Sequence, residues 1–143
     1  MEVDKADRIS TIEFRLDASS GVPTYLQLVH QVENALRLGS LVAGDQLPRV
    51  RDVVASLAIN PNTVLKAYRE LEHKGLAGGR PGLGTFVEQT LAPVAVREQQ
   101  MLRKRLDRWL SEAVTAGLDE DRISALFVSA LHDLRVRGAE RAS

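Results

Sequence analysis

Hydrophobic residues recur at intervals of three and four along residues 23–76, and this spacing predicts amphipathic helices. The first helix begins at Pro23 and Thr24 and stops at Gly39. Its apolar face consists of Tyr25, Leu28, Val29, Val32, Ala35 and Leu36. Two further helices have apolar faces made of Val50, Val53, Val54 and Leu57, and of Val64, Ala67, Tyr68 and Leu71. A short turn separates these two, which is typical of a helix-turn-helix.

The third of these helices carries clear signals at both ends. Asn60 is a favoured cap because its side chain accepts a hydrogen bond from a backbone N–H of the first turn. Pro61 follows at the first helical position, where its missing N–H costs nothing. Gly75 provides a stop, and Lys74 places a positive charge near the negative end of the helix dipole.

Glycine and β-prone residues replace the helical pattern after Gly75. Residues 76–88 read LAGGRPGLGTFVE, which predicts two short strands around a turn at residues 81–84. A β-hairpin directly behind a helix-turn-helix is called a wing. An alternating run at residues 11–17, TIEFRLD, predicts another short strand near the N-terminus.

Two more helical patterns follow residue 91, joined by the link AGLDED at residues 116–121. Asp119 is placed to cap the second of them. The link is so short that we expect an antiparallel helical hairpin. The predicted fold is therefore mainly α with a small β-hairpin. A winged helix-turn-helix domain at residues 12–88 precedes the helical hairpin at 89–137, and residues 1–11 and 138–143 form flexible ends.

Composition narrows the functional classes. The chain has 143 residues, of which 44% are hydrophobic and 27% charged, with no cysteine and a formal net charge of zero. This composition allows a packed core and excludes disulfide or thiolate chemistry. The first ten residues lack the apolar core of a signal peptide, and no apolar run reaches the length of a membrane span. We expect a cytoplasmic protein without membrane contact.

The neutral total conceals a basic segment. Residues 49–80 hold six basic side chains (Arg49, Arg51, Lys66, Arg69, Lys74 and Arg80) against three acidic ones (Asp52, Glu70 and Glu72). The local balance of six minus three is +3, which points to a polyanionic partner. An ordinary solvated surface would have the same composition, so charge alone leaves both interpretations open.

The polar start of the third helix suggests what that partner is. The N-terminal turn of a recognition helix faces base edges in the DNA major groove. Asn62 and Thr63 offer hydrogen-bonding groups there, whereas Asn60 is occupied by capping if the cap forms. Arg49 and Arg51 open the preceding helix and are placed to reach phosphates or a guanine edge. The alternative is that residues 60–63 serve only as a helix cap.

Residues 47–87 resemble the winged helix-turn-helix of the GntR family of bacterial transcription regulators. The matching features are Leu-Pro at 47–48, Thr-Val at 63–64, the pattern LE..GL at 71–76 and GTFV at 84–87. PTYLQL at 23–28 and INPNTVLKAY at 59–68 resemble the YtrA subfamily. This resemblance implies DNA-contacting positions at Arg51, Asn60, Asn62, Thr63 and Gly82.

The sequence departs from the family pattern at three places. Leu65, followed by Lys66, stands where many members have an arginine directly after the Thr-Val pair. The wing tip lacks the basic residue that relatives often carry, and Arg80 is the substitute we expect. Ala58 occupies a turn position where glycine is common, so a left-handed backbone there would cost roughly 1 kcal/mol.

The C-terminal hairpin is too small to bury its own apolar faces or to enclose a metabolite pocket. We expect it to form a homodimer through Leu102, Leu106, Trp109, Leu110, Ile123, Leu126, Phe127 and Leu131. The alternative is that the hairpin folds back on its own N-terminal domain. The resemblance implies a homodimeric repressor at a palindromic operator, in a subfamily that frequently autoregulates operons encoding ABC transporters.

An enzymatic function finds little support. His30, His73 and His132 lack metal-ligand spacing, and the glycine-rich run at 78–84 is not followed by the Lys-Ser/Thr of a phosphate loop. No catalytic residue, metal ligand or cofactor is therefore expected. A winged-helix module that binds proteins instead of DNA remains the alternative. A small-molecule effector is left open, because no residue pattern locates its site.

Overall fold

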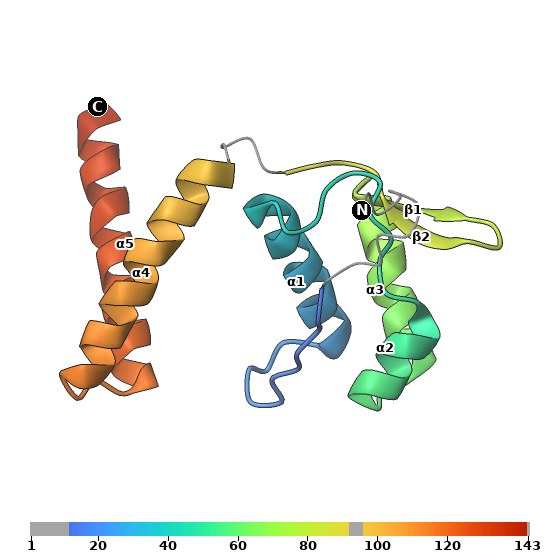
Figure 1. Ribbon diagram of the computed structural model, residues 1–143, viewed down its shortest axis with the longest axis horizontal. Coiled ribbons are helices and arrows are strands. Elements are labelled where there is room, and N and C mark those ends of the chain that lie inside the picture. Colours follow the sequence, from blue (N-terminus) through green and yellow to red (C-terminus); the bar gives the residue numbers. More distant parts are fainter. Residues whose placement is uncertain (1–11, 92–95, 143) are drawn as a thin grey trace, which may run out of the picture. The chain divides into compact units, whose positions relative to one another are not determined.

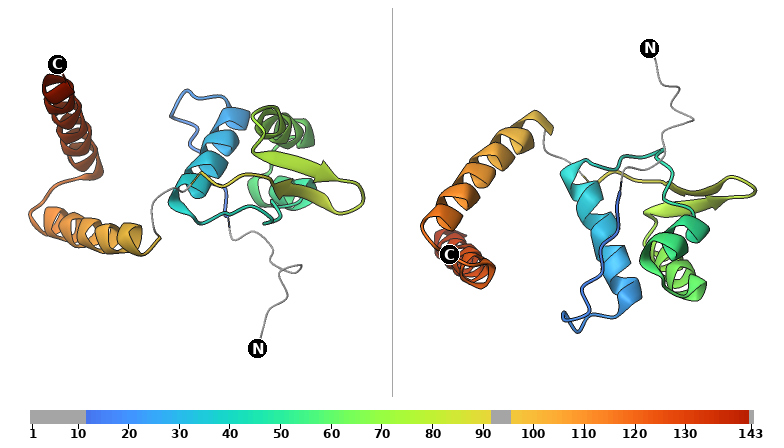
Figure 2. Two further views of the ribbon diagram at one scale, coloured as in Figure 1. Left: turned by 90° about the horizontal axis from the view of Figure 1, so that it is seen from above. Right: turned by 60° about the horizontal axis from the view of Figure 1, so that its bottom comes forward.

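The computed structural model describes residues 12–91 and 96–142. The chain divides into two compact units between residues 96 and 97. The first unit holds the helices α1 (Thr24–Leu38), α2 (Val50–Leu57) and α3 (Pro61–His73) and the strands β1 (Ala77–Arg80) and β2 (Gly84–Val87). The second holds α4 (Val96–Thr115) and α5 (Glu120–Ala142). In Figures 1 and 2, β1 and β2 extend from the helices of the first unit as a wing, which confirms the predicted winged helix-turn-helix.

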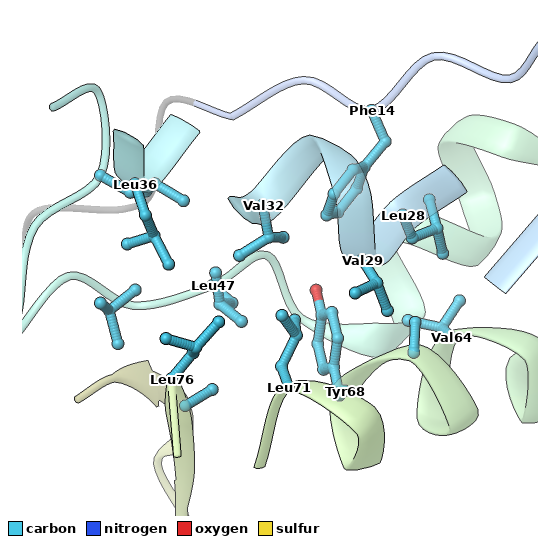
Figure 3. Close-up of a cluster of buried hydrophobic side chains, with 14 of the residues drawn as sticks. Phe14, Leu28, Val29, Val32, Leu36, Leu47, Val64, Tyr68, Leu71 and Leu76 are labelled. Atoms are coloured by element: carbon cyan, nitrogen blue, oxygen red, sulfur yellow. The ribbon is translucent and has the colours of Figure 1, made fainter. Parts of the chain in front are cut away.

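The core of the first unit lies where α1 crosses α3. Leu28, Val29 and Val32 of α1 are almost completely buried. They face Val64, Tyr68 and Leu71 of α3 across the interface in Figure 3. Burying a leucine or valine side chain stabilises the fold by about 1.5–3 kcal/mol. This packing leaves the opposite side of α3 facing outward.

The predicted boundaries of α3 are confirmed. The Asn60 side-chain oxygen accepts a hydrogen bond from the backbone N–H of Asn62 at 2.8 Å, and Pro61 is the first helical residue. Gly75 follows the helix in the left-handed region with φ 73°, and its N–H donates to the carbonyl of Glu72. Glycine adopts this conformation without the steric cost of a Cβ atom.

The turn between α2 and α3 depends on Ala58. Its φ of 54° and ψ of 44° place it in the left-handed region. No other non-glycine residue in the described ranges has a positive φ. The N–H of Ala58 donates to the carbonyl of Val54 at 2.9 Å, which ends α2 and turns the chain toward α3.

The wing is fixed to the loop that precedes α2. The two strands pair antiparallel, with Ala77 opposite Val87 and Arg80 opposite Gly84. The N–H of Leu47 donates to the Thr85 carbonyl at 2.9 Å, and the N–H of Val87 donates to the Asp45 carbonyl at 2.8 Å. Residues 44–47 therefore follow β2 on the side away from β1.

The strand predicted at residues 11–17 is wrong for residues 12–17; residue 11 lies outside the described ranges. This segment has no strand partner. Gln31 of α1 accepts the N–H of Arg15 and donates to the carbonyl of the same residue. Gln27 accepts the N–H of Asp17 at 2.9 Å and donates to the carbonyl of Asp17 at 3.0 Å. Two side-chain amides thus replace the hydrogen bonds that a neighbouring strand would have supplied.

In the second unit the chain doubles back between α4 and α5, as predicted (Figure 1). Gly117 has φ 94° in the turn, and Asp119 caps α5 by accepting the N–H of Arg122 at 2.8 Å. The two helices meet near the turn and diverge away from it in Figures 1 and 2. Among the described side chains of this unit, Ala113 alone is buried.

Two predicted boundaries need correction. The flexible end expected at 138–143 is helical through Ala142, because Gly138 keeps a helical backbone instead of stopping α5. The first unit extends beyond residue 88. Thr90 accepts the N–H of Ala43 at 3.2 Å, and Leu91 packs against the core. In the described ranges, no helix is long and apolar enough to cross a membrane.

Candidate nucleic-acid interface

The outward side of α3 is the surface on which the sequence places base readout. Asn62, Leu65, Lys66 and Arg69 are exposed there, while Val64 and Ala67 point into the core. Asn62 and Thr63 occupy the first turn, as predicted, with Asn62 exposed and Thr63 half-buried. The side-chain oxygen of Asn60 accepts the hydrogen bond of the helix cap, which leaves its amide NH₂ group as the donor for a ligand.

Lys66 is held toward α1 and not directly outward. Its ammonium nitrogen lies 4.2 Å from the centroid of the Tyr25 ring. A cation over an aromatic face gains about 0.5–1 kcal/mol at an exposed site. This contact places the charge of Lys66 at the edge of the exposed surface of α3, beside α1.

Arg49 and Arg51 stand at the start of α2, as the sequence suggests. The carbonyl of Arg49 accepts the N–H groups of Asp52 and Val53, at 2.9 and 3.1 Å, which starts the helix. Arg51 lies 3.9 Å from Asp52, but the two side chains are 76% and 67% exposed. An exposed pair at this distance contributes little, so the guanidinium of Arg51 can turn to another anion.

A buried tyrosine fixes the segment that leads into α2. The hydroxyl of Tyr68 donates to the carbonyl of Pro48, directly before Arg49. Burial raises the pKa of Tyr68 above its ordinary value, because the charged phenolate would lose its hydration. The hydroxyl therefore keeps its proton and its hydrogen bond, which ties α3 to the start of α2.

An open groove of about 750 Å³ lies between the start of α2 and the wing. Arg49 and Arg51 line one side, Arg80 and Gly82 line the other, and Tyr68 also contributes. Three arginine residues around one groove suit an extended chain of phosphates, for which arginine offers paired donors. The structure thus brings together the predicted arginines of α2 and of the wing.

The wing tip is held by two side-chain contacts. The guanidinium carbon of Arg80 lies 4.2 Å from the centroid of the Phe86 ring. The side-chain amide of Gln46 donates to the carbonyl of Leu83 at 2.8 Å. Gly82 has φ 74° with open space around its Cα, so the backbone at the tip can approach a ligand closely.

The DNA-contacting residues predicted from the sequence omit three residues of this surface: Leu65, Arg69 and Gln46. Arg69 and Leu65 could have been found from the helical period, since they follow Asn62 by seven and three residues on the same side of α3. The contact of Gln46 joins residues 37 positions apart in the chain. No local pattern signals such a contact.

The residues predicted for dimerisation form a separate apolar surface on α4 and α5. Leu102 is 61% exposed, Leu126 48% and Phe127 51% within the chain. Leu106, Trp109 and Leu131 are also exposed, whereas Leu110 and Ile123 are half-buried near the turn. In the parts of the chain that the structure describes, no cluster of acidic and histidine side chains could hold a metal ion.

Comparisons with known proteins agree with this architecture. Residues 24–87 match the family model "Bacterial regulatory proteins, gntR family". The HTH-type transcriptional repressor YtrA of Bacillus subtilis is 31% identical over 110 residues, an alignment that covers 76% of this chain and 85% of that protein.

Solved structures give the same result. A transcriptional antiterminator from Listeria monocytogenes EGD-e aligns with a TM-score of 0.55 and 28% identity, over 87% of this chain and 93% of that one. YtrA from Sulfolobus acidocaldarius, a GntR-family transcription factor, aligns with a TM-score of 0.50 and 30% identity, over 68% of this chain and 97% of that one. With its winged helix-turn-helix and its arginine-lined groove, the chain belongs to the YtrA-like subfamily of GntR regulators and is a DNA-binding transcription regulator.

Proposed function

We propose that this regulator is a homodimeric repressor that occupies a palindromic operator. The observation that carries the proposal is the apolar surface of α4 and α5, most of whose side chains stay exposed within the chain. Phe127 and Leu126 leave about half of their surface in water, and Leu102 leaves more. A second copy of the same surface would bury these side chains, as in most symmetric dimers.

A two-fold dimer matches a DNA site that is itself two-fold symmetric. Each protomer would place α3 in the major groove of one half-site, with Asn62 and Thr63 at base edges. Arg49, Arg51 and Arg80 would bind phosphates through the groove between α2 and the wing, supported by the local excess of positive charge. Lys66, Asn60 and Gly82 would add contacts at the edges of this surface.

Repression follows from occupancy of a promoter. The B. subtilis relative is called a repressor, and the YtrA-like subfamily frequently controls transporter operons that include its own gene. We propose the same arrangement here, with the operator in the DNA upstream of the regulator's own gene. Fluorescence anisotropy on that DNA should show tight binding that falls by orders of magnitude between about 50 and 200 mM salt. Equal binding to scrambled DNA at every salt concentration would contradict specific recognition.

The dimer is tested by a charge placed in the apolar surface. Phe127→Glu should convert the chain to a monomer in light-scattering chromatography, because a buried unpaired carboxylate is strongly unfavourable. It should also weaken binding to a palindrome at least about tenfold, since one half-site is then released. Ala125→Glu adds the same charge to the opposite, exposed side of α5 and should remain dimeric. A wild-type chain that is monomeric at micromolar concentration would refute the proposal.

A further inference from the structure

An apolar side chain lies in the middle of the polar outward surface of α3. Leu65 is 37% exposed, although the adjacent Val64 is completely buried. Asn62 precedes it by three residues and Arg69 follows it by four, and both are exposed. Side chains at these spacings lie along one side of a helix. Asn62, Leu65 and Arg69 therefore form one outward strip, which we call the readout strip.

The core does not account for Leu65. The apolar face of α3 is complete with Val64, Ala67, Tyr68 and Leu71, which are all buried against the rest of the unit. The neighbouring Lys66 directs its ammonium group onto the ring of Tyr25. At this level of the helix, the strip thus presents a leucine between an amide and a guanidinium.

The chemistry of the major groove offers such a leucine one kind of partner. Base edges there carry hydrogen-bonding groups and a single apolar group, the C5 methyl of thymine. Leucine has no hydrogen-bonding group, so it gains only by excluding water from an apolar surface. The side-chain amide of Asn62 can pair with adenine through its N6 and N7 atoms. The strip therefore suits a segment of the operator that contains A·T base pairs.

We propose that Leu65 contacts the C5 methyl of a thymine and so sets the base preference in the middle of each half-site. This inference rests on the proposed function, because it requires specific binding through α3. It adds a residue and the chemical group that this residue reads. Arg69, at the end of the strip, would then contact the phosphate or the base edge beyond that thymine.

The test removes the methyl group without altering base pairing. The preferred DNA is first selected from a random library with the full chain, and each thymine is then replaced singly by 2′-deoxyuridine. At one thymine in each half-site the replacement should weaken wild-type binding about fourfold, the value for one buried methyl group. In Leu65→Ala the same replacement should have no effect. Leu65→Met, which keeps an apolar side chain of similar size, should retain most of the penalty.

A matched control separates this readout from a general loss of apolar surface. Leu38 is 58% exposed at the end of α1, away from the readout strip. Leu38→Ala should keep the full sensitivity to deoxyuridine. The proposal is overturned if wild-type protein binds its selected DNA but ignores every replacement, or if the penalty persists in Leu65→Ala. A library that yields no preferred sequence would instead refute specific DNA binding, and the inference with it.

Discussion

Replacing Ala58 by glycine tests the geometry of the helix-turn-helix directly. The residue lies in the left-handed region, with φ 54° and ψ 44°, and its side chain is exposed. For a residue with a Cβ atom this conformation costs about 1–2 kcal/mol, whereas glycine adopts it freely. Because the methyl group is exposed, its removal sacrifices little packing. The gain in the folded state is therefore set by the backbone alone.

The unfolded state opposes this gain. A glycine increases the freedom of the unfolded chain, which destabilises the fold by about 0.4–1 kcal/mol. The difference leaves Ala58→Gly more stable by about 0.5 kcal/mol. For a unit of this size that free energy raises the melting temperature by about 2–4 °C.

The measurement should follow the first unit alone. Both tyrosines of the chain, Tyr25 and Tyr68, lie in that unit, and its single tryptophan, Trp109, lies in the other. Thermal unfolding can thus be followed by the tyrosine signal in the near-ultraviolet. The control is Ala55→Gly, an exposed position within α2, which should lower the melting temperature because glycine costs about 0.5–1 kcal/mol inside a helix. If Ala58→Gly destabilises the unit as much as the control does, the left-handed assignment fails.

Three other changes probe the wing, an ion pair and the groove. Gln46→Met removes the donor to the Leu83 carbonyl and should destabilise the first unit by about 1 kcal/mol, the contribution of one hydrogen bond, which lowers its melting temperature by about 4–8 °C; an unchanged melting temperature would mean that this contact does not hold the wing tip. The Lys74 ammonium, 2.8 Å from Glu33, lowers the pKa of that carboxyl despite its burial. The stabilisation that this ion pair provides is present above the pKa of Glu33 in the unfolded chain, near 4.3, and is lost as the pH falls through the lower pKa of Glu33 in the folded chain. Glu33→Gln should therefore cost about 1 kcal/mol at pH 7 in urea unfolding and progressively less below about pH 4; a constant difference would exclude the ion pair. Arg51→Ala should reduce the slope of log affinity against log salt by about two for a dimer on its palindrome, which is about one for each protomer, and an unchanged slope would remove this residue from the phosphate contacts.

The sequence predicts those parts of the fold that local signals determine. Asn60, Pro61 and Gly75 delimit α3 because capping depends on residues within one turn of the helix end. The same applies to Asp119 at the start of α5. Gly138 shows the limit of such signals. A glycine permits a helix to end without requiring it, and α5 continues to Ala142.

Features that depend on distant residues could not be predicted in this way. The alternation in residues 11–17 predicts a strand, but it does not reveal what residues 12–17 pair with. The side chains of Gln27 and Gln31 bind this segment from α1, at separations of 10 and 16 positions along the chain. In the candidate interface, the positions of Asn62, Arg49 and Arg51 follow from helix geometry. The position of Arg80 beside them depends on the wing's attachment to residues 44–47, which only the folded chain shows.

That attachment also influences how the protein meets its ligand. Backbone hydrogen bonds join residues 44–47 to β2, and the same loop leads directly into α2. The guanidinium groups of Arg51 and Arg80 therefore belong to elements whose relative freedom was lost when the unit folded. A phosphate chain that enters the groove therefore meets two backbone elements whose relative position is already fixed, and only the side chains of Arg51 and Arg80 remain to be ordered. The entropy cost of bringing these elements together is met in folding, so a larger share of each contact remains available as binding affinity.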